Sequence, residues 1–88
     1  MTEEEELAVD FEAGDVIIEV SPKRTPEGPL EWTYRFRRTY QYGGKEKTAF
    51  FFRREHDEPL SRALVHAIHW MNENKPEDWV RAQRARAA

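Results

Sequence analysis

Two aromatic-rich runs on either side of Gly43-Gly44 constrain the fold of this chain more than any other feature of its 88 residues. The first run begins at Trp32 and the second ends at Phe52, and both are rich in residues that favour β-strands. A pair of glycines between two such runs is typical of a β-hairpin. The sequence therefore predicts a central hairpin, and the rest of the chain has to cover its apolar face.

The length of the loop decides which side chains of this hairpin share a face, because successive residues of a strand point to opposite sides. A two-residue loop, Gly43-Gly44, would pair Phe36 with Phe51. A three-residue loop that also includes Tyr42 would pair Phe36 with Phe50. We expect the three-residue loop, because it gathers five large aromatic side chains on one face and leaves its last glycine at the left-handed position that such loops require.

A second hairpin is expected before the central one, because apolar and polar residues alternate on both sides of a turn signal at Ala13-Gly14. A tight turn there would pair Phe11 with Val16 and Val9 with Ile18. The outer face of this hairpin would be acidic. The two hairpins together predict four strands.

After the central hairpin, apolar residues recur at helical spacing and predict a helix over 59–72 with Asp57 as its N-cap. Its apolar stripe consists of Leu60, Leu64, Ile68 and Met71, with Ala63 and Ala67 beside it. We expect this stripe to cover the apolar face of the sheet and to bury Leu64 together with Phe36 and Phe50.

These elements predict one α+β domain, a four-stranded antiparallel meander sheet with one face covered by a C-terminal helix, in the order ββββα. We expect the domain to span 7–74, after a mobile acidic lead-in over 1–6. Residues 75–88 would form a short extra helix and a basic frayed tail, because Asn74 and Glu77 resemble a capping box.

Charge is divided unevenly along the chain, whose net charge is −3. Residues 1–31 hold ten acids and two bases, a net charge of −8, whereas residues 32–56 hold seven bases and two acids, a net charge of +5. The split indicates a basic binding strip beside an acidic one, or two solvated sheet faces that attract each other. The second reading is the commoner cause of such a pattern.

The composition also bears on location and assembly. The chain has no cysteine, its first residues do not resemble a signal peptide, and no apolar run approaches the roughly 20 residues of a membrane span. We therefore expect an intracellular, cytoplasmic protein without a membrane partner. A chain of this length buries only about 60–65% of its unfolded surface, so we also expect a homodimer.

The outer face of the central hairpin is the first candidate binding surface. In the expected register it carries bases around an exposed aromatic ring, with Tyr40 and Tyr42 near the loop. Its members are Arg35, Arg37, Lys47, Phe51 and Arg53. Bases mixed with aromatic rings are typical of surfaces that hold single-stranded nucleic acid. The arginines would lose this role if they paired with acids of the first hairpin, such as Asp10 and Glu19.

A protein partner has its own candidate residues. Trp79 and Val80 follow the main helix and would either dock on the domain or anchor a partner, because tryptophan is enriched at the centre of interfaces. Ile17 lies on the outer face of the first hairpin and would join an interface there, as would Phe51 in a dimer.

Catalytic and metal motifs are weak. His66, His69 and Glu73 have helical spacing that could hold a metal, but zinc helices use a His-Glu-x-x-His pattern that this chain lacks, and a polar helix face is the simpler reading. We expect no enzyme activity, no metal and no cofactor.

The expected function is that of a small non-catalytic binding domain that acts on an unidentified protein partner as an adaptor, regulator or inhibitor of phage or bacterial type. Single-stranded nucleic-acid binding is the alternative. Four antiparallel strands followed by a helix are similar in topology to the single-stranded-DNA-binding Whirly and PUR group, whose members dimerise. This resemblance concerns topology and implies no role for individual residues.

Overall fold

A computed structural model describes residues 7–87, and the lead-in expected over 1–6 lies outside the described residues. Four strands form one antiparallel sheet in the order β1-β2-β3-β4. They are β1 (Val9–Ala13), β2 (Val16–Arg24), β3 (Leu30–Tyr42) and β4 (Lys45–Ala49). A short 3-10 helix, η2 (Arg54–His56), leads into α1 (Asp57–Glu73), and α2 (Pro76–Ala87) follows. The predicted α+β fold, a meander sheet with a helix on one face, is confirmed.

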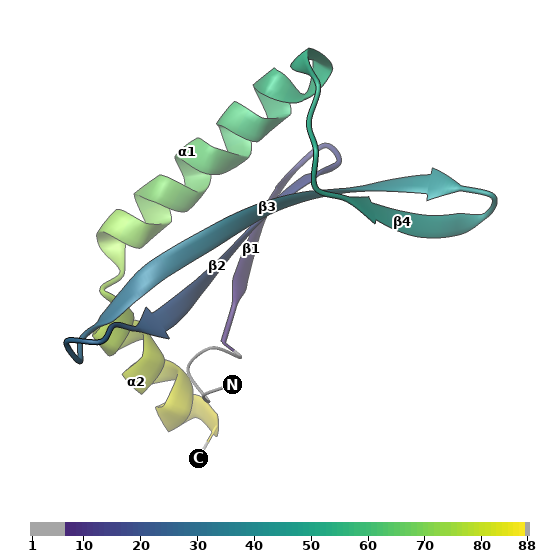
Figure 1. Cartoon of the computed structure of the whole chain (residues 1–88). Helices are drawn as coiled ribbons and strands as arrows, with labels where there is room; N and C mark the ends of the chain where they lie inside the picture. Colours follow the sequence, from purple (N-terminus) through teal and green to yellow (C-terminus); the bar gives the residue numbers. More distant parts are fainter. Residues whose placement is uncertain (1–6, 88) are drawn as a thin grey trace.

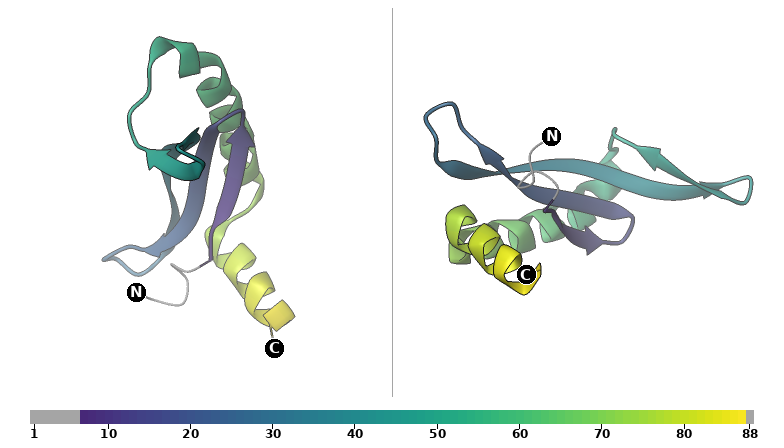
Figure 2. Two further views of the ribbon diagram at one scale, coloured as in Figure 1. Left: turned by 90° about the vertical axis from the view of Figure 1, so that its right-hand side faces the viewer. Right: turned by 90° about the horizontal axis from the view of Figure 1, so that it is seen from below.

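Both helices lie on the same side of the sheet (Figures 1 and 2). Helix α1 packs over β1 and β2, and α2 contacts β3 near the opposite end of α1 from η2. The extra helix is longer than expected and continues to Ala87. No helix in the described part of the chain is long and apolar enough to cross a membrane.

The register of the first hairpin differs from the prediction by two residues. Phe11 pairs with Ile18 and Val9 with Val20, because the turn is formed by Gly14 and Asp15 rather than by Ala13 and Gly14. Gly14 has φ +57°, which a residue with a side chain rarely adopts. A shift of two residues leaves every side chain on its predicted face.

The predicted register of the central hairpin is wrong, because the loop has two residues. Tyr42 pairs with Lys45, so Gly43 and Gly44 alone make the turn, with φ values of +60° and +77°. Two successive positive φ values are those of a type I′ turn, whose twist matches the flanking strands and for which glycine is well suited. Strand β4 also ends at Ala49, so Phe50 does not pair with Phe36 and is 71% exposed.

The far end of this hairpin projects from the body of the protein (Figure 1). Strand β3 pairs with β2 only as far as Arg38, and beyond it pairs with β4 alone. We call this two-stranded extension, residues 39–48, the arm. No part of α1 or α2 lies against it (Figure 2).

The core lies between α1 and the first two strands. Ile18 and Val20 are fully buried against Ala63 and Ala67, which have 2% and 0% of their surface exposed. The alanines, rather than the larger residues, are therefore the centre of the packed face of the helix. Leu60, Leu64 and Met71 flank it and are partly buried, whereas Ile68 is 40% exposed. Phe36 reaches this core, but Phe50 does not.

The start of α1 also differs from the prediction. His56 is the N-cap residue, and Asp57 is the first helical residue, with its carboxylate 2.6 Å from the guanidinium of Arg54. The imidazole Nδ1 of His56 accepts a hydrogen bond from the backbone N–H of Arg53 at 2.9 Å. This contact fixes the turn between the arm and α1.

Three tryptophans join the two helices to the sheet. The ring centroids of Trp32, Trp70 and Trp79 lie 4.8–5.6 Å from one another. The indole N–H of Trp32 donates to the carbonyl of Asn74 at 2.6 Å. Glu77 does not form the expected capping box and instead accepts a hydrogen bond from the backbone N–H of Leu30 at 2.9 Å. These contacts dock α2 on β3.

Candidate functional site

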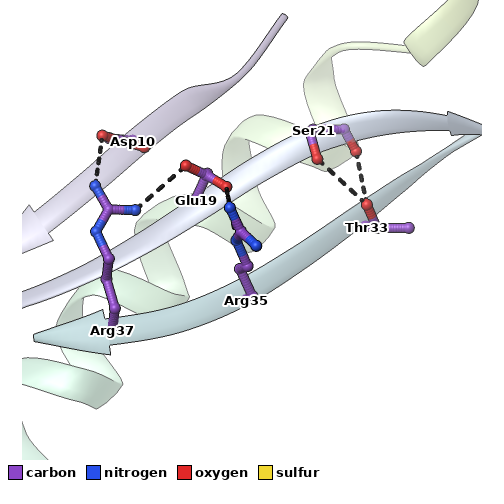
Figure 3. A network of polar contacts seen from close by, with 6 residues as sticks. All are labelled: Asp10, Glu19, Ser21, Thr33, Arg35 and Arg37. Atoms are coloured by element: carbon purple, nitrogen blue, oxygen red, sulfur yellow. Dashed lines mark hydrogen bonds and ion pairs between the residues drawn. The ribbon is translucent and has the colours of Figure 1, made fainter. Parts of the chain in front are cut away.

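The outer face of the sheet carries a network of ion pairs (Figure 3). The guanidinium of Arg35 lies 2.8 Å from the carboxylate of Glu19, and that of Arg37 lies 3.2 Å from the same carboxylate and 3.4 Å from Asp10. Register explains these contacts, because Glu19 pairs directly with Arg35 across β2 and β3. Such exposed pairs add little stability, but here they cancel the charge of both arginines.

Two other members of the expected strip lie on the opposite face of the sheet. In the observed register Lys47 pairs with Tyr40, whose side chain points to the face that α1 covers on the body. Phe51 is on that face too, because its ring packs against the guanidinium of Arg38. The structure therefore separates Lys47 and Phe51 from Arg35 and Arg37.

The observed register assembles a different surface on the arm. Tyr40 is opposite Lys47, Tyr42 is opposite Lys45, and Arg38 is opposite Ala49. Residues opposite each other in an antiparallel pair share a face, with Cβ atoms about 4.5–5.5 Å apart. We call this surface the basic arm face. It consists of Arg38, Tyr40, Tyr42, Lys45, Lys47 and Phe51.

Arg38 holds the inner end of the basic arm face together. Its Cζ atom lies 4.9 Å from the ring centroid of Phe51 and 5.5 Å from that of Tyr40. Its Nε–H also donates to the carbonyl of Phe51 at 3.0 Å. Phe51 has left the β-ladder, so these contacts are what fix its ring beside the strand. A guanidinium has further N–H donors that remain for a ligand.

The three rings of the basic arm face are exposed to solvent, and its two lysines are unpaired within the described part of the chain. Tyr42 is 73% exposed, Phe51 60% and Tyr40 40%. Neither Lys45 nor Lys47 forms an ion pair with any residue from 7 to 87. The only acid within the arm, Glu46, pairs with Gln41 and so lies on its other face. The basic arm face thus combines three cations and three rings without a carboxylate.

Arg53 lies where the chain leaves the arm, with an exposed side chain. Its backbone is held by the contact with His56, and the His56 ring packs edge-on against Phe52 at 6.1 Å. Rings continue from Phe52 to Phe36 and Tyr34, with centroid distances of 6.4 and 5.8 Å. An aromatic row therefore runs from the start of α1 to β3 and then along that strand.

The residues expected to contact a protein partner are placed within the domain. Val80 is 3% exposed and Ile17 is 9% exposed. Trp79 is half-buried in the tryptophan cluster. The sequence left open whether Trp79 and Val80 dock on the domain or anchor a partner. In the structure both pack against their own domain.

Sequence reasoning did not identify Arg38 and Lys45, which are members of the basic arm face. The two-residue alternative for the loop would have identified them, because that register places Arg38 and Lys45 on the same face as Tyr40 and Tyr42. Sequence reasoning also missed Trp70, which lies outside the aliphatic stripe of α1. Residues 7–87 contain no group of three or more histidine, cysteine, aspartate or glutamate side chains placed to hold a metal ion, and this includes His66, His69 and Glu73.

Comparison of the chain with known protein families, with curated protein sequences and with solved structures finds no match in any of the three.

Proposed function

We propose that the protein is a non-catalytic binding domain that holds single-stranded DNA or RNA on the basic arm face. The observation that supports this proposal most is that the observed register places the lysines of the arm and the paired arginines of the sheet on opposite faces. Free lysines and exposed rings share one face of the arm, whereas Arg35 and Arg37 are neutralised on the other face of the sheet. Proteins that bind single strands combine a positive surface with rings on which bases stack.

Cations supply affinity in this proposal. Lys45, Lys47 and the free donors of Arg38 contact phosphates, and each neutralised phosphate releases counterions. Single strands give a slope of log affinity against log salt of about −0.7 per phosphate, so three contacts correspond to about −2. Binding of this kind has little sequence preference, because phosphates carry no base identity.

Aromatic rings supply the second part of the contact. Tyr40 and Tyr42 are two residues apart on β3, which separates their Cα atoms by about 6.6–6.8 Å along the strand. Each ring therefore offers its own stacking surface to a base. Phe51 adds a third ring at the inner end of the face. Single strands suit this surface because their bases are free to leave a neighbour and stack on a side chain.

Fluorescence anisotropy with labelled single-stranded thirty-mers at ~50 mM salt tests the proposal, since electrostatic binding is strongest at low salt. The double variant Lys45→Gln/Lys47→Gln should reduce the salt slope by about 1.4, which is two phosphate contacts. Tyr42→Ser should weaken binding about 5- to 150-fold, the equivalent of ~1–3 kcal/mol for one stacked base.

Arg35→Gln/Arg37→Gln is the matched control, because it removes the same number of charges from the outer face. It should leave the affinity nearly unchanged. The proposal fails if the wild-type protein does not bind at tens of micromolar, or if the control weakens binding as much as the lysine variant does.

A protein partner is the second candidate, and the exposure of Phe50 favours it. Phe50 and Phe51 are adjacent, 71% and 60% exposed, and more apolar than phosphate binding requires. An affinity pull-down from the native host, with nuclease treatment, compares the wild type with Phe50→Ser. A partner that resists nuclease and is lost with Phe50→Ser supports this candidate, and a partner that nuclease removes supports the first.

A further inference from the structure

The side of β3 that faces away from β2 is only partly occupied by another strand. Strand β4 pairs with β3 from Arg38 to Tyr42, and after β4 the chain leaves the sheet and rises to η2 (Figure 1). Within residues 7–87, no strand pairs with β3 on this side before Arg38. We call this stretch of β3, residues 31–37, the open edge. It ends at α2, where Glu77 reaches the backbone of Leu30.

The backbone of β3 points towards the open edge at every second residue, because successive residues of a strand alternate in direction. The N–H of Thr39 donates to the carbonyl of Asp15 on the β2 side, whereas the N–H of Leu30 donates to Glu77 on the other side. The pairing with β2 and β4 is continuous along β3, without a bulge. Three residues therefore present both their N–H and their C=O to the open edge: Trp32, Tyr34 and Phe36.

Apolar side chains lie beside the open edge on the face of the sheet that carries α1. Tyr34 is 48% exposed, because α1 packs over β1 and β2 rather than over β3. Ile68 is 40% exposed and lies on the flank of α1 that is turned towards β3. Its position follows from that of Pro59, which lies next to Gly14 in the first hairpin and is about 180° away from Ile68 around the helix. A strand added to the open edge would direct every second side chain against Tyr34 and towards Ile68.

A cation lies beside the open edge on the other face of the sheet. The guanidinium of Arg35 contacts one oxygen of Glu19, Oε1, through both Nε and Nη2. The Arg35 side chain is 75% exposed, so its other N–H groups are open to a second acceptor. A carboxylate on an added strand would repeat, on this side of β3, the cross-strand contact that Glu19 makes from β2.

We propose that the open edge binds an extended peptide segment of another protein, which joins the sheet as a strand antiparallel to β3 and in line with β4. Strand β4 already occupies the same edge in this direction. Apolar and acidic residues alternate in the bound segment, because Tyr34 and Ile68 lie on one face and Arg35 on the other. In this mode of recognition, main-chain hydrogen bonds supply affinity and the alternate side chains supply specificity.

The open edge does not overlap the basic arm face, which begins at Arg38, so this proposal does not depend on nucleic-acid binding. Isothermal titration calorimetry tests it with a synthetic peptide as long as the open edge, in which valine and glutamate alternate and both ends are blocked. The peptide should bind with a dissociation constant of about 10–500 µM, the range of a short segment held by few contacts.

Two methylated forms of this peptide identify the mode of binding. In an antiparallel pair, a residue opposite Tyr34 shares its face and exchanges both backbone hydrogen bonds with it. The valine N–H groups therefore point to β3, and the glutamate N–H groups point to solvent. Methylation of the valine nitrogens should weaken binding at least about tenfold, because the main-chain hydrogen bonds are lost. Methylation of the glutamate nitrogens should leave binding nearly unchanged.

Two variants of the protein locate the site. Tyr34→Ser should weaken binding of the unmodified peptide several-fold, because it removes the ring beside the open edge. Tyr42→Ser is the matched control for peptide binding and should leave it unchanged, because β4 already occupies the edge beside Tyr42. Circular dichroism should show that both variants are folded, and the methylated peptides test the proposal on the wild-type protein alone.

Three results would overturn the proposal. The first is a peptide that does not bind at ~1 mM. The second is equal binding of the two methylated peptides, which would mean that the peptide is held by its charge, as on the basic arm face, and not by its backbone. The third is a loss of binding in Tyr42→Ser as large as that in Tyr34→Ser.

Discussion

Replacement of Ile18 by alanine tests the packing of α1 on the sheet. Ile18 has no exposed surface and lies in the cluster with Ala63 and Ala67. The substitution removes three carbon atoms, which at ~0.8 kcal/mol each is about 2.4 kcal/mol of lost transfer free energy. The cavity that remains raises the loss to about 3–4 kcal/mol. Small domains unfold with a free energy of only about 5–15 kcal/mol, so much of the stability would be lost.

Urea denaturation followed by circular dichroism measures this loss, with Ile68→Ala as the matched control. The control deletes the same atoms from a side chain that is 40% exposed, and we expect it to lose less than about 1.5 kcal/mol. Equal losses in the two variants would show that α1 does not cover β2 as described.

Three further substitutions test other parts of the fold. Phe50→Ser should change the free energy of unfolding by no more than about 0.5 kcal/mol, because the ring is 71% exposed; a loss of several kcal/mol would instead support the three-residue loop. Gly44→Ala should strain the turn by about 1–2 kcal/mol, because residue 44 has φ +77°. Faster amide hydrogen exchange in β4 would show this strain, and unchanged exchange would contradict the type I′ turn. Glu77→Ala should leave the N–H of Leu30 without its acceptor and speed tryptic cleavage within α2, whereas an unchanged cleavage rate would mean that this contact does not hold the helix.

The order of elements was predictable because hydrophobic periodicity depends on local sequence alone. Alternation identified the four strands, and helical spacing identified α1. The error of two residues in the first hairpin did no harm, because Phe11 and Ile18 stayed on the same face. The error of one residue in the central loop moved Lys47 from one face of the sheet to the other, and this changed the set of side chains that share a face with Lys47.

Register was beyond the sequence argument for a physical reason. Burial of Phe50 favoured the three-residue loop, but the type I′ geometry of Gly43-Gly44 and the end of β4 at Ala49 decided the pairing. Similarly, the predicted stripe on α1 assumed that its largest aliphatic residues face the sheet. The sheet instead approaches the small side chains of Ala63 and Ala67, and Ile68 turns towards solvent.

The central claim, that the basic arm face is the binding surface, is tested most directly by mapping on amide resonances. Single-stranded DNA is titrated into the isotope-labelled protein, and two-dimensional nitrogen–proton NMR spectra then report the chemical shift of each backbone amide separately. We predict that the largest shifts fall on residues 38–47 and on Phe51. Shifts centred on Arg35, Arg37 and Glu19, or an unchanged spectrum in the presence of excess DNA, would contradict it.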